Sequence, residues 1–206
     1  MDRRREEFAT RINQLTGVGA EAANQEVLQS IERLFYWAAF ADKYGGEVKE
    51  TPVYGATVSV NEPVGVIGIA CPDEKPLLGF VSLLGPAIVR GNSVVIIPSE
   101  KYPLVITDLY QVFETSDVPA GVVNIITGPR DLLTKTLVQH MAIQAVWYFG
   151  TAIGSYHVEH ESSFNLKRTF VNYGQPRNWE DVTQGAGIEF LYHACQVKNI
   201  WAPAGV

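Results

Sequence analysis

Residues 62–128 constrain the fold most strongly, because they read as strand, helix, strand, helix and strand without interruption. Three apolar runs carry β-branched residues on both faces, as expected for strands that are covered on both sides. These runs are residues 62–72, 92–98 and 119–128. The two segments between them have the length and apolar character of helices. Strands and helices that alternate at this spacing predict right-handed crossovers and a parallel sheet.

The rest of the chain extends or covers this sheet. Two helices are predicted before it, at residues 2–16 and 21–44, and Phe35, Trp37 and Phe40 of the second helix are expected to pack in the core. After the third strand the pattern predicts, in order, a helix at 130–140, a strand at 143–149, a loop and helix at 150–163 and a strand at 168–174.

Two further segments alternate with a period of two, which is typical of half-exposed strands. In the first, Ala56, Val58 and Val60 alternate with polar or small residues, and in the second, Ile200 faces away from Val197 and Trp201. They predict a small antiparallel flap, whose free edge is either protected or used for pairing with another chain. The predicted interface residues are Tyr54, Thr57, Val58, Val60, Val197, Ile200 and Trp201.

The predicted fold class is therefore α/β: a Rossmann-like parallel sheet with helices on both faces plus a small antiparallel oligomerisation flap. Residues 1–50 supply helices that cover the core, residues 51–61 and 186–206 supply the flap strands, and residues 62–185 form the Rossmann-like domain. Residues 175–187 are polar and turn-rich.

Composition excludes several classes of function. The net charge of −6 and the pI near 5.2 argue against nucleic-acid binding. No uncharged run is long enough to span a bilayer and no signal peptide is visible, so a cytoplasmic protein without a membrane partner is expected. Cys71 and Cys195 are predicted to be buried structural thiols, and His157 and His160 lack the spacing of a metal site, so no metal is expected.

Four segments resemble, in order and almost without gaps, the cofactor-binding half of aldehyde dehydrogenases across residues 30–174. They read LFYWAAFADKYGGE, EPVGVIGIACP, KPLLGFVSLLGPAIVRGNSVVIIPSEKYPL and VPAGVVNIITG. The tail IEFLYHACQVKNIWAP resembles the helix and strand that end these chains, where the strand joins an oligomerisation domain. NYGQPRNWED and QVKNIWAPAG look like the degenerate C-terminal domain of family 16 aldehyde dehydrogenases.

The two catalytic positions that this resemblance locates are altered. Where the family has an asparagine that donates to the developing oxyanion, the turn at residues 72–76 carries Glu74, whose carboxylate repels negative charge. Where the family has its general base, the chain carries Asn172, which cannot accept a proton at neutral pH. The nucleophilic cysteine belongs to a catalytic domain much longer than the 32 residues that follow Gly174. The resemblance therefore implies that the catalytic domain is absent.

The cofactor positions are altered as well. The lysine that binds the ribose in the family is Ile97, although Glu100 persists. The glycine turn beside the adenine reads Gly128 and then Arg130, which places a long side chain where the family has none. The pyrophosphate loop is one residue shorter and begins with Gly150 and Thr151, but a helix N-terminus there could still hold an anion. These six residues form a vestigial pocket in which no cofactor is expected.

Three functions remain open on the sequence. The first is a non-catalytic aldehyde-dehydrogenase-like module, expected to be a homo-oligomer, that assembles with and supports an active aldehyde dehydrogenase domain of the same or a partner chain. The second is residual binding of NAD, or NAD-dependent oxidoreductase activity completed by a neighbouring domain. The third is an interaction scaffold for an unrelated protein. The resemblance to family 16 also implies a longer, NAD-dependent parent chain with an active domain before Met1.

Overall fold

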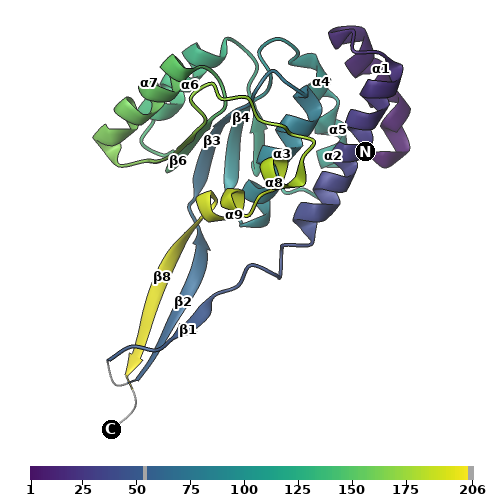
Figure 1. Cartoon of the computed structure of the whole chain (residues 1–206). Helices are drawn as coiled ribbons and strands as arrows, with labels where there is room; N and C mark the ends of the chain where they lie inside the picture. Colours follow the sequence, from purple (N-terminus) through teal and green to yellow (C-terminus); the bar gives the residue numbers. More distant parts are fainter. Residues whose placement is uncertain (53–54, 204–206) are drawn as a thin grey trace.

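A parallel five-stranded sheet forms the centre of the computed structural model, which describes residues 1–52 and 55–203 (Figure 1). Its strand order is β5-β4-β3-β6-β7. The strands are β3 (Val66–Ala70), β4 (Ser93–Ile97), β5 (Val123–Ile125), β6 (Ala145–Tyr148) and β7 (Arg168–Val171). Every pairing between neighbours is parallel, which confirms the predicted α/β class.

The strand order reverses at β3, which pairs with β4 on one side and with β6 on the other. Ile69 is opposite Ile96 of β4 and Trp147 of β6. In open α/β sheets this reversal leaves a crevice outside the carboxyl ends of the two strands, where ligands bind. The crevice between the ends of β3 and β6 is therefore the place to look for a site.

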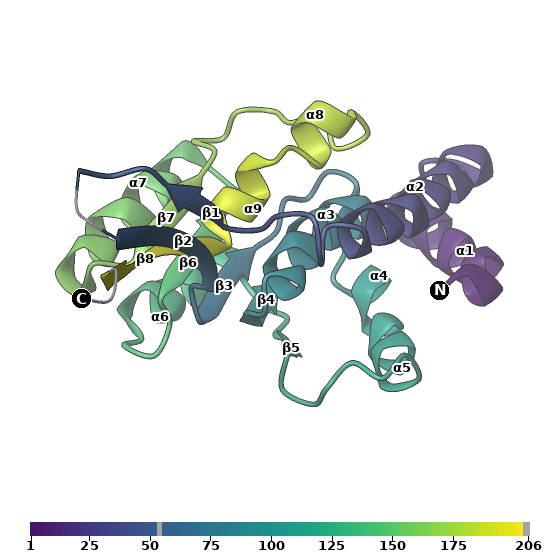
Figure 2. The ribbon, with the colours of Figure 1, turned by 90° about the horizontal axis from the view of Figure 1, so that it is seen from below.

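Helices cover both faces of the sheet (Figure 2). One face packs against helices from both ends of the chain, and the other packs against α6 and α7. The α-helices are α1 (Arg5–Thr16), α2 (Ala20–Ala38), α3 (Pro76–Val89), α4 (Leu104–Thr107), α5 (Leu109–Glu114), α6 (Arg130–Gln139), α7 (Ala152–Ser162), α8 (Val182–Gly185) and α9 (Glu189–His193). Two short 3-10 helices are η1 (Asp2–Arg4) and η2 (Ser163–Asn165).

Helix α3 is buried along almost its whole length, and a side chain of α2 caps its N-terminus. Glu26 Oε1 accepts from the backbone N–H groups of Leu77 at 2.9 Å and Leu78 at 3.2 Å, two donors with no partner inside the helix. Burial raises the pKa of Glu26, against the opposing effect of these two hydrogen bonds. The contact joins α2 to the turn between β3 and α3.

Two helix predictions need correction. Helix α2 ends at Ala38 and not at Tyr44, and Phe35 is 74% exposed, so only Trp37 of the predicted aromatic stripe is fully buried. The single helix predicted for residues 101–117 is divided into α4 and α5. At the division the Thr107 hydroxyl donates to the carbonyl oxygen of Leu104 at 2.9 Å, a local bond of the kind that competes with regular helix.

A second, antiparallel sheet forms an arm that projects from the body (Figure 1). Its order is β1-β2-β8, with β1 (Glu47–Lys49), β2 (Gly55–Pro63) and β8 (Cys195–Pro203). The flap prediction is confirmed, but β1 was not expected, and residues 186–194 lie in the body, where Phe190 is buried in the core. No helix in the described ranges is long and apolar enough to cross a membrane.

The register of the arm separates the predicted interface residues onto two faces. Val48, Val58 and Ile200 are directly opposite one another across the three strands and form one apolar row, in which Val48 is 77% and Ile200 46% exposed. On the other face Thr57 is opposite Trp201 and is only 4% exposed. Tyr54 lies outside the described residues.

Replacement of Gly85 by alanine should destabilise the body, because the added Cβ would lie 2.3 Å from Trp37 Cδ1 in the contact between α3 and α2. Overpacking costs about 1–3 kcal/mol and the better helix propensity of alanine returns about 1 kcal/mol, so a net loss of up to about 2 kcal/mol is expected. Urea unfolding measures it. Gly45→Ala is the matched control, since nothing lies within 4 Å of the added Cβ there. Equal stability of the two variants would contradict this packing.

Candidate functional site

A cleft of about 230 Å³ lies at the carboxyl edge of the sheet, at the reversal of strand order. It is formed by the loops that follow β3, β6 and β7 and by the first residue of α6. Its lining residues are Pro72, Asp73, Glu74, Arg130, Phe149, Gly150, Thr151, Asn172, Gly174, Gln175, Pro176, Arg177 and Trp179. Two acidic and two basic side chains are among them, so the lining carries no net formal charge.

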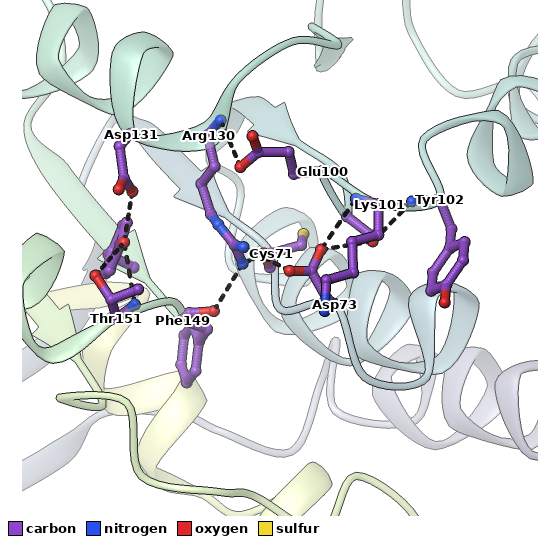
Figure 3. A network of polar contacts seen from close by, with 11 residues as sticks. Cys71, Asp73, Glu100, Lys101, Tyr102, Arg130, Asp131, Phe149 and Thr151 are labelled. Carbon is purple, nitrogen blue, oxygen red and sulfur yellow. Dashed lines mark hydrogen bonds and ion pairs between the residues drawn. The ribbon is translucent and has the colours of Figure 1, made fainter. Parts of the chain in front are cut away.

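The guanidinium of Arg130 fills the space between the ends of β3 and β6 (Figure 3). Its Nη1 donates to the carbonyl oxygens of Cys71 at 2.9 Å and Phe149 at 3.4 Å, and its Nη2 lies 2.6 Å from Asp73 Oδ2. The backbone N–H of the same residue donates to Glu100 Oε2 at 3.1 Å. The side chain that the sequence placed in a vestigial pocket is thus the central element of a closed polar network.

Asp73 is the partner that makes this network possible. Its Oδ1 accepts from Ser99 Oγ at 2.8 Å and from the backbone N–H of Lys101 at 3.2 Å. Burial disfavours its charge, but the bonds from Ser99 and Arg130 outweigh burial, so the pKa of Asp73 lies below its ordinary value. Although Asp73 lies in the charged turn at residues 72–76, its side chain is only 16% exposed.

The loop at residues 150–154, which the sequence suggested could hold a phosphate, packs against the side chain of Tyr148, the last residue of β6. The Tyr148 hydroxyl donates to Asp131 Oδ1 at 2.6 Å and accepts from the backbone N–H of Thr151 at 3.1 Å. A Cβ at Gly150 or Gly154 would lie 2.4 Å or 2.0 Å from that hydroxyl oxygen. Both glycines therefore make room for the tyrosine ring, whereas the sequence pattern suggested room for a phosphate.

Helix α7 is also capped from within the chain. Thr151 Oγ1 accepts from the backbone N–H of Gly154 at 3.0 Å. Together with the bond from Thr151 N–H to Tyr148, this cap satisfies two backbone donors that an anion could otherwise have used. Burial and the bond to Asp131 raise the pKa of Tyr148, so the hydroxyl stays protonated and donates to that carboxylate.

The other predicted site residues are spread around this cleft. Ile97 is buried, and Glu100 is held by the backbone of Arg130. Gly128 lies just before α6, outside the cleft lining. The side-chain amide of Asn172 donates to the carbonyl oxygen of Gln175 at 3.0 Å and closes a local turn. Glu74 is exposed at the rim.

Neither cysteine lines the cleft. Cys71 and Cys195 are both buried, as predicted, and burial raises the pKa of each thiol, which disfavours the reactive thiolate. Within residues 1–52 and 55–203, no group of three or more His, Cys, Asp or Glu side chains could hold a metal ion. The residues at this edge of the sheet form a closed polar network around Arg130 and Asp73.

Sequence reasoning missed three residues around the cleft: Asp73, Tyr148 and Arg177. Asp73 and Tyr148 meet Arg130 and Asp131 across 57 and 17 positions of the chain. The one local signal was the glycine pair around residues 150–154, which was read as a phosphate loop. A polar contact between distant positions leaves no periodicity that a single sequence could reveal.

Comparison with known proteins identifies relatives of this fold. The aldehyde dehydrogenase family model matches residues 1–177. An aldehyde dehydrogenase of Agaricus bisporus is 34% identical over 154 residues, which are 74% of this chain and 31% of the relative. Rat aldehyde dehydrogenase 1A1 is 32% identical over 180 residues, 85% of this chain and 36% of the relative.

Solved structures agree with these relatives. A betaine aldehyde dehydrogenase of Staphylococcus aureus in complex with NAD⁺ superimposes with a TM-score of 0.78 at 27% identity. The match covers 82% of this chain and 34% of that one. The chain therefore spans about a third of the length of the proteins that it matches.

The Asp73→Asn substitution should destabilise the fold by about 2–3 kcal/mol, because it leaves the largely buried Arg130 guanidinium without its counter-charge. Chemical denaturation measures the loss. Asp108→Asn is the matched control: it removes a more exposed ion pair with Arg11, at 3.3 Å, and should change stability by less than about 1 kcal/mol. If the two variants were equally stable, the network would not hold the edge of the sheet together.

Acid should weaken the wild-type protein in a window set by Asp73. Its folded-state pKa lies below the ordinary value of 3.8, so its contribution is complete above that value and is lost as the pH falls through the folded-state pKa. Urea unfolding between about pH 6 and pH 3 should show a steeper loss for wild type than for Asp73→Asn. If the unfolding free energies of wild type and Asp73→Asn fell in parallel with pH, the acid sensitivity would come from other groups.

Proposed function

Because the chain belongs to the aldehyde dehydrogenase family, we propose that it is a non-catalytic module of that family. It assembles with an active aldehyde dehydrogenase domain, of the same or a partner chain, and does not oxidise a substrate itself. The observation that carries the proposal is the filling of the switch-point crevice by Arg130 and Tyr148, which hydrogen-bond to the chain's own groups.

Further support comes from the chemistry that remains at the cleft. Glu74 and Asn172 replace the oxyanion donor and the general base expected from the family resemblance. Both cysteines are buried away from the lining. The proposal therefore includes no cofactor for this module, and it assigns the chain to the degenerate domains of family 16 aldehyde dehydrogenases.

The arm is the proposed assembly surface. Val48, Val58 and Ile200 form an apolar row on a strand pair that projects from the body, and such a face gains stability when a partner covers it. The outer edge of β8 offers backbone groups for strand addition. We propose a second copy of this chain or an active aldehyde dehydrogenase domain as the occupant, which makes the module a homo-oligomer or a supporting subunit.

Residual NAD binding is the second candidate. It is favoured by the retention of Glu100 and by the N-terminus of α7 beside the cleft, and the Staphylococcus aureus relative is a complex with NAD⁺. In this chain, however, Glu100 already accepts from Arg130, and the cleft of about 230 Å³ is small for a dinucleotide.

Titration of NAD⁺ into the protein by calorimetry should give no saturable heat. An active family member titrated under the same conditions is the positive control. A dissociation constant in the micromolar range, which corresponds to a binding free energy of about −8 kcal/mol, would instead support residual NAD binding.

Charge on the apolar row should weaken assembly while the body stays folded. Ile200→Lys places an ammonium between Val58 and the expected partner, and light scattering across a concentration series should show a smaller mean mass at each concentration than for wild type. Asn199→Lys, on the opposite face of the same strand, is the matched control and should assemble normally. A wild-type protein that stays monomeric, alone and with an active aldehyde dehydrogenase, contradicts the assembly role.

A further inference from the structure

Residues 175–187, here called the strap, follow β7 and form one side of the cleft. Four strap residues line it: Gln175, Pro176, Arg177 and Trp179. The match to the aldehyde dehydrogenase family model ends at residue 177, so most of the strap lies beyond the matched segment.

The guanidinium of Arg177 lies in a cage of four aromatic rings. Its Cζ is 5.1 Å from the ring centre of Phe190, 5.7 Å from Phe149, 5.8 Å from Trp179 and 5.9 Å from Phe170. A cation within about 6 Å of a ring centre is attracted by the negative face of that ring. Four rings around one charge form the arrangement by which proteins recognise alkylammonium and related cations.

Few hydrogen bonds compete with the rings for this cation. Arg177 Nη2 forms an ion pair with Glu189 Oε1, at the start of α9. Arg177 Nη1 is buried and has no hydrogen-bond partner among the described residues. The aromatic cage is thus a principal contribution to holding this side chain.

The rest of the strap is held by contacts to the body at its middle and far end. Arg33 Nη2 donates to the carbonyl oxygen of Trp179 at 3.0 Å, and Lys75 Nζ lies 2.7 Å from Glu180 Oε1. At the far end, the Tyr36 hydroxyl donates to the carbonyl oxygen of Ala186 at 3.1 Å. Arg177 and Trp179 are the two strap residues that belong both to the cage and to the cleft lining.

We propose that the strap is a lid over the cleft and that its latch is a cation-binding aromatic cage, which Arg177 fills in cis. The ligand class of the cage is a guanidinium or an alkylammonium group. Loss of Arg177 from the rings would loosen this side of the cleft, and a cation that took its place would again hold Trp179 of the strap against the rings of the body. The lid closes the cleft on which the proposed function rests, but the latch does not depend on whether that cleft binds a dinucleotide.

Hydrogen–deuterium exchange on the full chain tests the latch. In Arg177→Ala the amides of residues 177–187 should exchange at least about tenfold faster than in wild type, while those of β3, β4 and β6 keep their rates. Arg3→Ala, which removes an exposed arginine outside the cage, should change neither set. Ethylguanidinium at low millimolar concentration should restore protection of the strap in Arg177→Ala, and neutral ethylurea should not.

Arg177→Lys separates charge from shape, and it tests the cage even if alanine perturbs the fold. Lysine keeps a cation but loses the planar fork, so strap exchange should fall between those of wild type and Arg177→Ala. Unchanged strap exchange in Arg177→Ala, acceleration of the sheet amides to the same extent, equal restoration by ethylurea, or a lysine variant as loose as alanine would each overturn the proposal. Because the readout is exchange of the strap, it is independent of the calorimetric test for NAD⁺.

Discussion

The ion pair between Arg130 and Asp73 is the contact on which the carboxyl edge of the sheet depends. Removing two charges from water is costly, and a buried pair is tolerated only where further hydrogen bonds satisfy both groups. Here the guanidinium also donates to two backbone carbonyls, and the carboxylate also accepts from Ser99 and Lys101. The pair connects the loops after β3, β4 and β6 to the start of α6.

The same contact determines what the crevice can bind. At a topological switch point the ends of two parallel strands diverge, and a ligand ordinarily fills the gap. In this chain the Arg130 side chain fills it, and beside it Tyr148 uses the room left by Gly150 and Gly154. A ligand would have to displace groups that are already hydrogen-bonded, which is costly because the displaced groups would remain buried without partners.

Closure of the cleft and exposure of the arm are complementary properties. The body buries aromatic residues around the strap, and Arg130 and Asp73 at the carboxyl edge are paired with each other. The arm instead presents an apolar row across three strands and a free outer edge on β8. The polar groups of Arg130 and Asp73 in the crevice are thus paired within the chain, whereas the apolar row of the arm lies on a surface that projects away from the body (Figure 1).

The sequence by itself determined the order and type of the elements. Apolar runs separated by helical segments predicted the parallel sheet, and alternation of apolar and polar residues predicted the two long strands of the arm. Both patterns depend only on which side of an element is buried. Exposure of Phe35 and the early end of α2 were decided by neighbouring elements. Only the tertiary structure brought Asp73 to Arg130, Tyr148 to Asp131 and Arg177 into its four rings. Such contacts form because the fold brings the ends of distant strands together. A polar side chain in a loop belongs to no periodic pattern, so the sequence does not indicate which residue it will contact.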